Sequence, residues 1–546
     1  MNTKIALHHF ILTLAALAVM FLPMGQGDFF GSEGDWYSQH VGAAQALRQT
    51  IIDSGNPFPQ FINIGGGINA FDLAYYGMFR PDVMISCLFP DVEIEYFIAG
   101  YAVLGVVASV NMMYLWLRKK GLRLSSCLAG GVLMAGASCF FHAHHQIMFV
   151  NYMPFLILAL MGIDRLIRTG KPAFSAAAVF LIMIHSFYYG PVCLVVCLIY
   201  FFHQLSAEGH KDKAVMVRKA FGAVFLGIGA SAVLLLPAAA AIFSTAKDSG
   251  SFSAQPMGIA DLSMESLLYD PYGCGLTVIC MFALLRALFT KEKRVTAAVI
   301  LSMVVIPAIW FVLSGFLYPR AKILMPLITL IIWICAEELE DLTKSGSKKD
   351  ILVLALCLIP AIFSKWKVLM AADWLILLAW MVASRIRKIP PAAKKAVFTV
   401  MMTFPLWVSI GVSFAGEDYI KADDSRQGEF EFTQEQLKEI SGGLYRFDYI
   451  SDSLANCNYL PSGSVKKTAM YSSVTNDIYS EFFYDIMDNP IRYRNRVILV
   501  PDGNIYFNFL MGIRYIVAGE DDLPYGYSVA GRQDDLVLAE NKDVLP

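Results

Sequence analysis

Long apolar segments alternate with short polar loops over the first 415 residues of the chain. A helix needs about 20 apolar residues to cross a bilayer core, and most of these segments approach that length. The shorter ones are expected to tilt or to be partly buried. The pattern therefore predicts a polytopic membrane domain over 1–415, with about thirteen transmembrane helices. The predicted segments are 5–24, 94–117, 123–141, 147–163, 172–187, 190–205, 219–241, 273–290, 295–316, 323–339, 351–364, 368–384 and 396–415.

The first apolar segment, 5–24, has two interpretations. It follows a short start with one lysine, as the apolar stretch of a cleaved signal peptide also does. Many further segments follow it, however, and no clear small-residue cleavage site closes it. We therefore interpret it as a retained membrane anchor.

Lysine and arginine residues gather in alternate loops, and this sets the predicted orientation. With thirteen segments all six basic loops fall on one side, which the positive-inside rule makes cytoplasmic. The N-terminus is then cytoplasmic, while the loop 25–93, the loop near 242–272 and the tail lie outside. The basic loops are Arg118–Arg123, Arg165–Lys171, Lys211–Lys219, Lys291–Arg294, Lys344–Lys349 and Arg385–Lys395.

The composition supports a membrane protein with a different tail. Hydrophobic residues make up 57% of the chain and charged residues 16%, with a mean hydropathy of +0.54, whereas soluble domains are nearer half apolar and a quarter charged. Residues 417–546 hold 22 acidic and 12 basic side chains, a net charge of −10 within a total of −2. This tail has turn signals and short β-rich runs at 497–500 and 515–517. We predict a mixed α/β domain over 416–546, outside the membrane.

The first external loop, about 25–93, is far longer than most connections and is predicted to be functional. Apolar residues at helical spacing follow Asp35, so a helix should begin directly after it. One interpretation makes Asp35 the N-cap of that helix. The other makes it a general base that takes a proton from an acceptor hydroxyl. The two are compatible. For Gly65–Gly67, simple loop flexibility is the first interpretation and close backbone approach to a ligand the second.

Ionisable groups near the outer ends of the apolar segments form three clusters, and such groups tend to be functional. Arg320 suits a lipid phosphate because its planar fork can bind two oxygens, although an interfacial arginine can also snorkel to the headgroups. The histidines indicate a polar turn, with metal binding as the alternative. Since no CxxC pair occurs among the 10 Cys, no zinc site or disulfide framework is predicted. The clusters are Asp35 with Glu33, Gln39 and His40; His142, His144 and His145 with Asn151; and Tyr318-Pro319-Arg320 with Lys322.

Several short motifs resemble, in the same order, those of the YfhO family of bacterial membrane proteins, which is grouped with the GT-C type of polytopic glycosyltransferases. The resemblance covers essentially the whole chain. Each motif alone is weak, and their order is the more specific feature. The motifs are Gly34-Asp35 with Gln39; Gly65–Asn69, Ala74-Tyr75-Tyr76 and Arg80-Pro81; Phe149–Pro154 and Gly162–Leu166; Tyr318–Arg320; Tyr471–Ser473; Met511–Val517; and Glu540-Asn541 with Leu545-Pro546.

The resemblance implies a GT-C-like helical bundle with an external C-terminal domain. It also implies transfer of a sugar from a polyprenyl-phosphate-linked donor to an acceptor outside the bacterial cell membrane, often a cell-wall polymer. Asp35 maps to the acidic base of the first external loop in related enzymes. No cofactor is required, a divalent metal is possible, and no nucleic-acid partner is expected. The candidate substrate-binding residues are Glu33, Gln39, His40, Asn69, Asp72, Tyr75, Tyr76, Arg320 and Lys322.

Two rival functions stay open. A transporter or flippase of lipid-linked glycans would suit the many segments, but no matched pair of interrupted helices is evident in two halves of the sequence. A non-catalytic envelope assembly protein would keep the fold without the chemistry. Family chains commonly continue past the motif at Leu545-Pro546, so a shortened member or a fragment is expected.

The orientation can be tested with a membrane-impermeant thiol reagent on intact cells. A cysteine placed in the loop 344–349 should stay unlabelled, because the positive-inside rule puts that loop in the cytoplasm. A cysteine at Phe430 should be labelled. The reverse pattern would remove Asp35 from the outer face.

Overall fold

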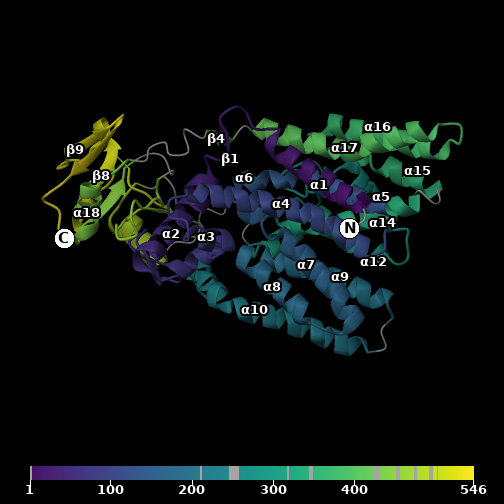
Figure 1. The fold of residues 1–546 in the computed structure, drawn as a ribbon, viewed down its shortest axis with the longest axis horizontal. Helices are drawn as coiled ribbons and strands as arrows, with labels where there is room; N and C mark the ends of the chain where they lie inside the picture. Colours follow the sequence, from purple (N-terminus) through teal and green to yellow (C-terminus); the bar gives the residue numbers. More distant parts are fainter. Residues whose placement is uncertain are drawn as a thin grey trace.

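In a computed structural model of the protein, a long helical bundle carries a smaller domain at one end (Figure 1). The C-terminal domain lies at the left of that view, against the first loop, and most helices run along the long axis. The structure describes residues 3–209, 212–244, 258–316, 319–342, 348–416, 418–421, 430–450, 456–472, 476–490, 496–500 and 502–545.

Each predicted apolar segment contains a helix, and the helices pack both against their neighbours in the sequence and against more distant ones. Helix α7 packs against α4, α8 and α9, while α10 packs against α8 and α17 against α16. The long helices of the bundle are α1 (Thr3–Phe21), α4 (Ile94–Lys119), α5 (Leu124–Ala135), α7 (Met153–Thr169), α8 (Ala173–His185), α9 (Gly190–Ala207), α10 (Lys213–Ser244), α11 (Val278–Ala287), α12 (Arg294–Val305), α14 (Ile328–Leu342), α16 (Lys367–Arg385) and α17 (Pro391–Gly416).

The predicted count of thirteen spans is not confirmed. Within the described ranges, seven helices are long and apolar enough to cross a membrane, or up to nine if two bent helix pairs each count as one span. The bends are 48° between α5 and the stretch Ser138–His145, and 88° between α12 and α13 (Pro307–Leu313). Apolar runs in the interior do not reveal where a helix stops. The segment 351–364, for example, is helical as α15 (Lys348–Leu356) and then becomes a short 3-10 turn.

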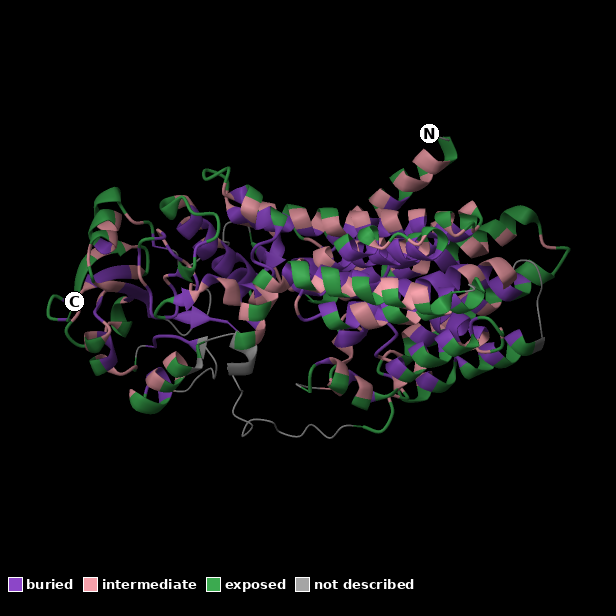
Figure 2. Ribbon diagram, turned by 90° about the horizontal axis from the view of Figure 1, so that it is seen from below, coloured by how far each residue is buried: buried purple, intermediate pink, exposed green. Residues whose placement is uncertain are grey.

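A partly buried carboxylate inside the bundle is paired with hydrogen-bond donors, as a low-dielectric interior requires. The Asp164 carboxylate of α7 accepts hydrogen bonds from the Trp116 indole of α4 at 2.9 Å and from the Tyr200 hydroxyl of α9 at 2.7 Å. Buried residues follow the middle of the bundle in Figure 2. The outward side of α10 exposes large apolar side chains such as Phe225 and Leu236, as expected of a face turned to lipid.

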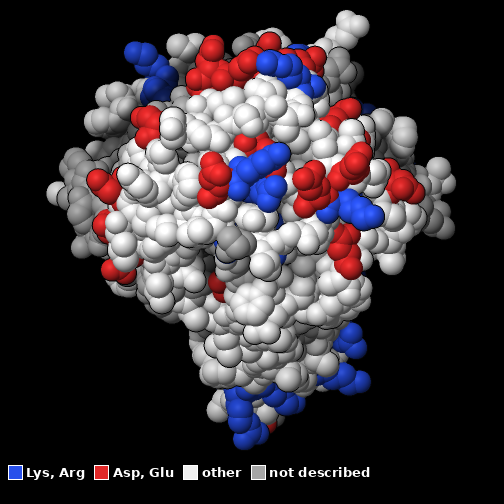
Figure 3. Space-filling model, turned by 90° about the vertical axis from the view of Figure 1, so that its left-hand side faces the viewer, with Lys and Arg blue, Asp and Glu red and all other residues white. Residues whose placement is uncertain are grey.

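The C-terminal region contains the predicted sheet. Strand β5 (Arg446–Tyr449) runs parallel to β8 (Ile513–Gly519), and β10 (Leu536–Glu540) pairs antiparallel with β8 and with β9 (Ser528–Gln533), giving the order β5-β8-β10-β9. The predicted run 515–517 lies within β8. Helices α18 (Gln434–Gly442), α19 (Asp477–Glu481) and α20 (Ile505–Leu510) complete the region. Acidic side chains outnumber basic ones on the face seen in Figure 3, in line with the net charge of the tail.

The first loop folds into short elements on which the C-terminal domain docks. Strand β1 pairs with β4 (Tyr419–Lys421), the strand that follows α17. The other elements of the loop lie between β1 and α4 along the chain. The elements of the loop are β1 (Asp28–Ser32), the π-helix η1 (Trp36–Val41), α2 (Gly42–Ser54), β2 (Phe61–Ile62), β3 (Ile68–Asn69), the 3-10 helix η2 (Ala70–Tyr76) and α3 (Pro81–Ser86).

Two glycines allow the first loop and the C-terminal domain to approach each other closely. The Lys467 amide donates to the Asn63 carbonyl at 2.8 Å, and the amides of Gly65 and Gly66 donate to the carbonyls of Ala469 and Lys467 at 3.0 Å each. Both glycines have positive φ, and a Cβ on Gly65 would lie 2.9 Å from the Met470 sulfur. The prediction of simple flexibility for this stretch is therefore wrong: the glycines allow close approach of the C-terminal domain.

Candidate active site

Asp35 lies directly before η1 but does not cap it. Its backbone is already helical, with φ −58° and ψ −26°, and its side chain makes no capping hydrogen bond. The N-cap prediction is therefore wrong, because the carboxylate points to partners other than the amides of the first turn. The helix predicted directly after Asp35 is confirmed, and its apolar positions are buried. These positions are Tyr37, Val41, Ala44, Leu47 and Ile51.

The Asp35 carboxylate instead accepts three side-chain hydrogen bonds. Gln39 donates to Oδ1 at 2.8 Å from the same helix, and the Tyr471 hydroxyl donates to Oδ1 at 2.5 Å from the C-terminal domain. The Gln146 amide donates to Oδ2 from the turn that follows α6 (His142–His145). Hydrogen bonds to an ionised group are about twice as strong as neutral ones. Asp35 thus joins three segments that are far apart in the sequence.

The other predicted residues beside Asp35 divide into exposed and buried ones. Glu33 is exposed, whereas Gln39 and His40 are buried. Burial lowers the pKa of His40 to about 3, so its imidazole is neutral, and its ring lies edge-on to Tyr76 at 5.7 Å. The Tyr76 hydroxyl accepts a hydrogen bond from Ser472 at 3.3 Å. His40 and Tyr76 therefore pack η1 against η2, and Tyr76 also contacts the C-terminal domain.

The remaining first-loop candidates belong to η2. Asn69 caps this 3-10 helix, since its side-chain oxygen accepts from the Phe71 amide at 3.0 Å. Tyr75 is half-buried, with its ring edge-on to Tyr76 at 5.0 Å. Burial raises the pKa of Asp72 to about 6, so this carboxyl titrates close to neutral pH.

The histidine cluster is a short helix paired with the start of the tail, not a polar turn. Asp418 accepts from His144 Nε2 at 3.0 Å and lies 3.2 Å from His145 Nε2. The His144 ring also stacks on Tyr419 at 4.1 Å, and His142 Nε2 lies 3.1 Å from the Pro271 carbonyl. In the described part of the chain, no group of three or more His, Cys, Asp or Glu side chains is arranged to hold a metal ion.

Arg320 and Lys322 line a cavity of about 560 Å³ between the loop before α11 and the segment after α13. Tyr272 and Trp310 also line it, and Tyr318 lies outside the described residues. Arg320 is exposed and precedes the 3-10 helix η6 (Ala321–Leu327), while the Lys322 ammonium lies 4.7 Å above the Phe149 ring.

The acidic side chains of the same cavity are bound to neighbouring groups. Asp261 accepts from the amide and hydroxyl of Ser263 and from the Ser266 amide. Lys365 pairs with Asp270 at 2.7 Å and with Glu265 at 3.7 Å. These contacts fix the loop that carries Tyr272.

Tyr272 connects the three clusters. Burial raises the pKa of its phenol, the charges of Asp418 and Asp35 raise it further, and Arg320 lowers it. Its ring also lies edge-on to His142 at 4.6 Å. Tyr272 and Arg320 line the same cavity, and the turn after α6, whose His142 packs on Tyr272, also carries Gln146, the donor to Asp35. The three clusters therefore lie at the same end of the bundle.

The sequence analysis missed four of these residues. Asp418, Gln146 and Tyr272 have no local pattern that marks them. Tyr471 belongs to the motif Tyr471–Ser473, but the motif alone assigns it no role. Each acquires its partner through tertiary contacts, such as the 436 residues that separate Tyr471 from Asp35. Only information on pairs of distant positions could have found them.

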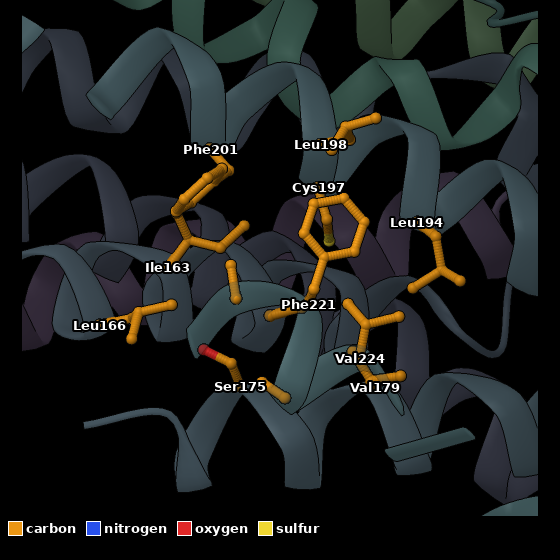
Figure 4. A pocket seen from close by; sticks show the side chains of 13 residues that line it. Ile163, Leu166, Ser175, Val179, Leu194, Cys197, Leu198, Phe201, Phe221 and Val224 are labelled. Carbon is orange, nitrogen blue, oxygen red and sulfur yellow. The ribbon is translucent and has the colours of Figure 1, made fainter. Parts of the chain in front are cut away.

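A separate cavity between α7, α8, α9 and α10 has an apolar lining apart from Ser175 and Cys197 (Figure 4). Phe201 and Phe221 are among the side chains that border it. Such a lining suits hydrocarbon and offers no charged group to a sugar or a phosphate.

The fold is that of GT-C-type glycosyltransferases. The crystal structure of ArnT from Cupriavidus metallidurans bound to undecaprenyl phosphate matches with a TM-score of 0.50 and 13% identity, over 98% of this chain and 99% of that chain. The cryo-EM structure of arabinofuranosyltransferase AftD from Mycobacteria matches with a TM-score of 0.54 and 12% identity, over 100% of this chain and 40% of that chain.

The chain belongs to the YfhO family, because the family described as "Bacterial membrane protein YfhO" matches residues 9–546. The family resemblance predicted from the sequence is thus confirmed, as is the GT-C-like fold. No curated protein matches the sequence.

Asp72 makes stability depend on pH. Its pKa of about 6 in the folded protein exceeds the ordinary 3.8, so the folded state binds the proton more tightly and loses stability as pH rises from about 4 to 6. Because solvent screens a half-buried carboxyl, only part of this shift counts, and Asp72→Asn should stabilise the protein by about 1–2 kcal/mol at pH 7. Thermal unfolding in detergent should show this gain at pH 7 and none near pH 4. An equal gain at both pH values would contradict the prediction.

Proposed function

We propose that this protein is a membrane glycosyltransferase, which moves a sugar from a polyprenyl-phosphate-linked donor to a cell-wall or surface polymer outside the cytoplasm. The observation that carries the proposal is the placement of a carboxylate, Asp35, and a cavity lined by Arg320 at one end of a GT-C-type bundle, joined through the segment His142–Gln146 and Tyr272. Undecaprenyl phosphate, the ligand of the ArnT structure, belongs to the carrier class in question.

On the donor side, the cavity beside Arg320 and Lys322 receives the phosphate and the sugar. Its volume of about 560 Å³ falls within the usual range for ligand sites. The guanidinium fork binds two phosphate oxygens, and both cations stabilise the charge that develops when the bond between the sugar and the phosphate breaks. A phosphate is a good leaving group, so no strong acid is needed on this side.

On the acceptor side, Asp35 is the general base. As the acceptor hydroxyl attacks the anomeric carbon, its proton passes to the carboxylate, and the electron pair of the breaking bond leaves with the phosphate. Attack opposite the leaving group inverts the anomeric configuration. The C-terminal domain, which covers Asp35, guides the polymer.

Two observations favour the rival functions. The bent helix pairs at α5 and α12 are the kind of interruption that transporters use. The three hydrogen bonds on Asp35 would also suit a purely structural junction in a non-catalytic assembly protein. Vesicles with labelled lipid-linked sugar separate these functions: transfer from the outer leaflet without flipping supports the transferase.

Arg320 should govern the use of the donor. Arg320→Ala is expected to raise the KM for the lipid donor more than the KM for the acceptor, because the phosphate loses its fork. Arg320→Lys should recover only part of the loss, since lysine keeps the charge and lacks the bidentate geometry. Initial rates at varied donor concentration measure both. Unchanged donor dependence in both variants would make Arg320 an interfacial residue.

Asp35 should be essential for transfer. Asp35→Asn keeps the size of the side chain and removes its basicity, so the transfer rate should fall on the order of a hundredfold or more. The exposed Glu33 serves as a control, and Glu33→Gln should keep the wild-type rate if Asp35 is the base. If Asp35→Asn transfers sugar normally, Glu33 or Asp72 becomes the next candidate.

A second control separates the basicity of Asp35 from its hydrogen bond with Gln146. In Asp35→Asn the new amide can no longer accept from Gln146. The double variant Asp35→Asn, Gln146→Glu restores that hydrogen bond with donor and acceptor exchanged. A structural role predicts recovered activity in the double variant, whereas the base mechanism predicts that it stays inactive.

A further inference from the structure

Tyr471 reaches Asp35 from a rigidly held strand. It lies in β6 (Met470–Tyr471), which pairs with β7 (Arg496–Val497), and its side chain is buried. Asn458 accepts from the Tyr471 amide at 3.0 Å and donates to the Tyr471 carbonyl at 2.8 Å. The same Asn458 amide donates to the Ser38 carbonyl of η1 at 2.8 Å. One asparagine therefore fixes the tyrosine against the helix that carries Asp35.

The residues just before Tyr471 are held as firmly. The buried Asp448 carboxylate accepts from the Thr468 amide at 2.7 Å, from the Thr468 hydroxyl at 2.5 Å and from the Ala469 amide at 3.0 Å. The buried Lys467 ammonium donates to three backbone carbonyls. These contacts, with the backbone pairing to Asn63 and Gly65, make the C-terminal domain a fixed support for the Tyr471 hydroxyl.

The hydrogen bonds leave one oxygen of Asp35 with spare capacity. A carboxylate offers about four acceptor sites, two on each oxygen. Gln39 and Tyr471 use both sites on Oδ1, and Gln146 uses one on Oδ2. Among the described residues no fourth donor is bound to this carboxylate, and Asp35 is only half-buried. The remaining acceptor site is therefore on Oδ2.

We propose that Tyr471 is a positioning residue, through which the C-terminal domain aims Oδ2 of Asp35 at the acceptor hydroxyl. The inference rests on the proposed transferase function. The proton of the acceptor passes to Oδ2 as the acceptor oxygen bonds to the anomeric carbon and the phosphate departs with its electron pair. Without the tyrosine hydroxyl, Oδ1 also has a free acceptor site, so the carboxylate no longer offers the acceptor Oδ2 alone.

Tyr471→Phe tests this role, because it keeps the buried ring and removes only the hydroxyl. We expect kcat to fall about tenfold to a hundredfold, the scale of a hydrogen bond to a charged group, with the KM of both substrates unchanged. In the Asp35→Asn background the same substitution should change the residual rate less than twofold, because its effect passes through the carboxylate.

A matched control removes a different hydroxyl from the same docked segment. Tyr479 donates to the Thr468 carbonyl at 3.1 Å and does not contact Asp35. Tyr479→Phe should therefore leave kcat at the wild-type value, and thermal unfolding of both variants shows whether docking is preserved. If Tyr471→Phe does not fold, Gln39→Leu removes the other donor to Oδ1 and should give the same result in both backgrounds.

The outcomes separate this inference from the proposed function. Equal losses from Tyr471→Phe with and without Asp35 would show that the tyrosine only supports the structure, and would overturn the inference. A raised KM with unchanged kcat would make it a substrate contact and overturn it as well. Full activity of Asp35→Asn would instead refute the function on which the inference rests.

Discussion

A shared carboxylate holds together parts of this protein that the chain keeps far apart. Asp35 receives donors from its own helix, from the turn after α6 and from the C-terminal domain. Loss of the Asp35 carboxylate would leave its three donors unsatisfied, at about 1–3 kcal/mol for each buried group. The junction of the first loop, the turn after α6 and Tyr471 therefore depends on one side chain, while backbone contacts at Gly65 and Gly66 hold the C-terminal domain at a second place.

The apolar pattern predicted where helices lie better than how they cross the membrane. Each predicted segment contains a helix because the apolar composition of a segment is a local property. Lengths such as that of α11, with ten residues, depend on neighbours that bury the helix from several sides. The chain bends at Pro307, between α12 and α13. The proline is visible in the sequence, but the bend angle of 88° depends on packing.

In the candidate site, too, local properties could be predicted from the sequence and tertiary contacts could not. Local sequence indicated Asp35 and a helix after it, but its side-chain partners needed the fold, and the N-cap hypothesis failed for that reason. Arg320 was predicted as a phosphate ligand from its type and position. The cavity beside it arises from a loop more than 40 residues earlier, which no spacing rule connects to Arg320.

The glycine contacts between the first loop and the C-terminal domain bear on how the family can vary. Backbone groups make those contacts, and a Cβ would meet the Met470 side chain at Gly65 and the Tyr479 ring at Gly66. The positive φ of both residues also disfavours any other side chain. Substitution of either glycine would therefore loosen the contact between the two parts, whereas surface positions of the C-terminal domain away from this contact are free to change without affecting it.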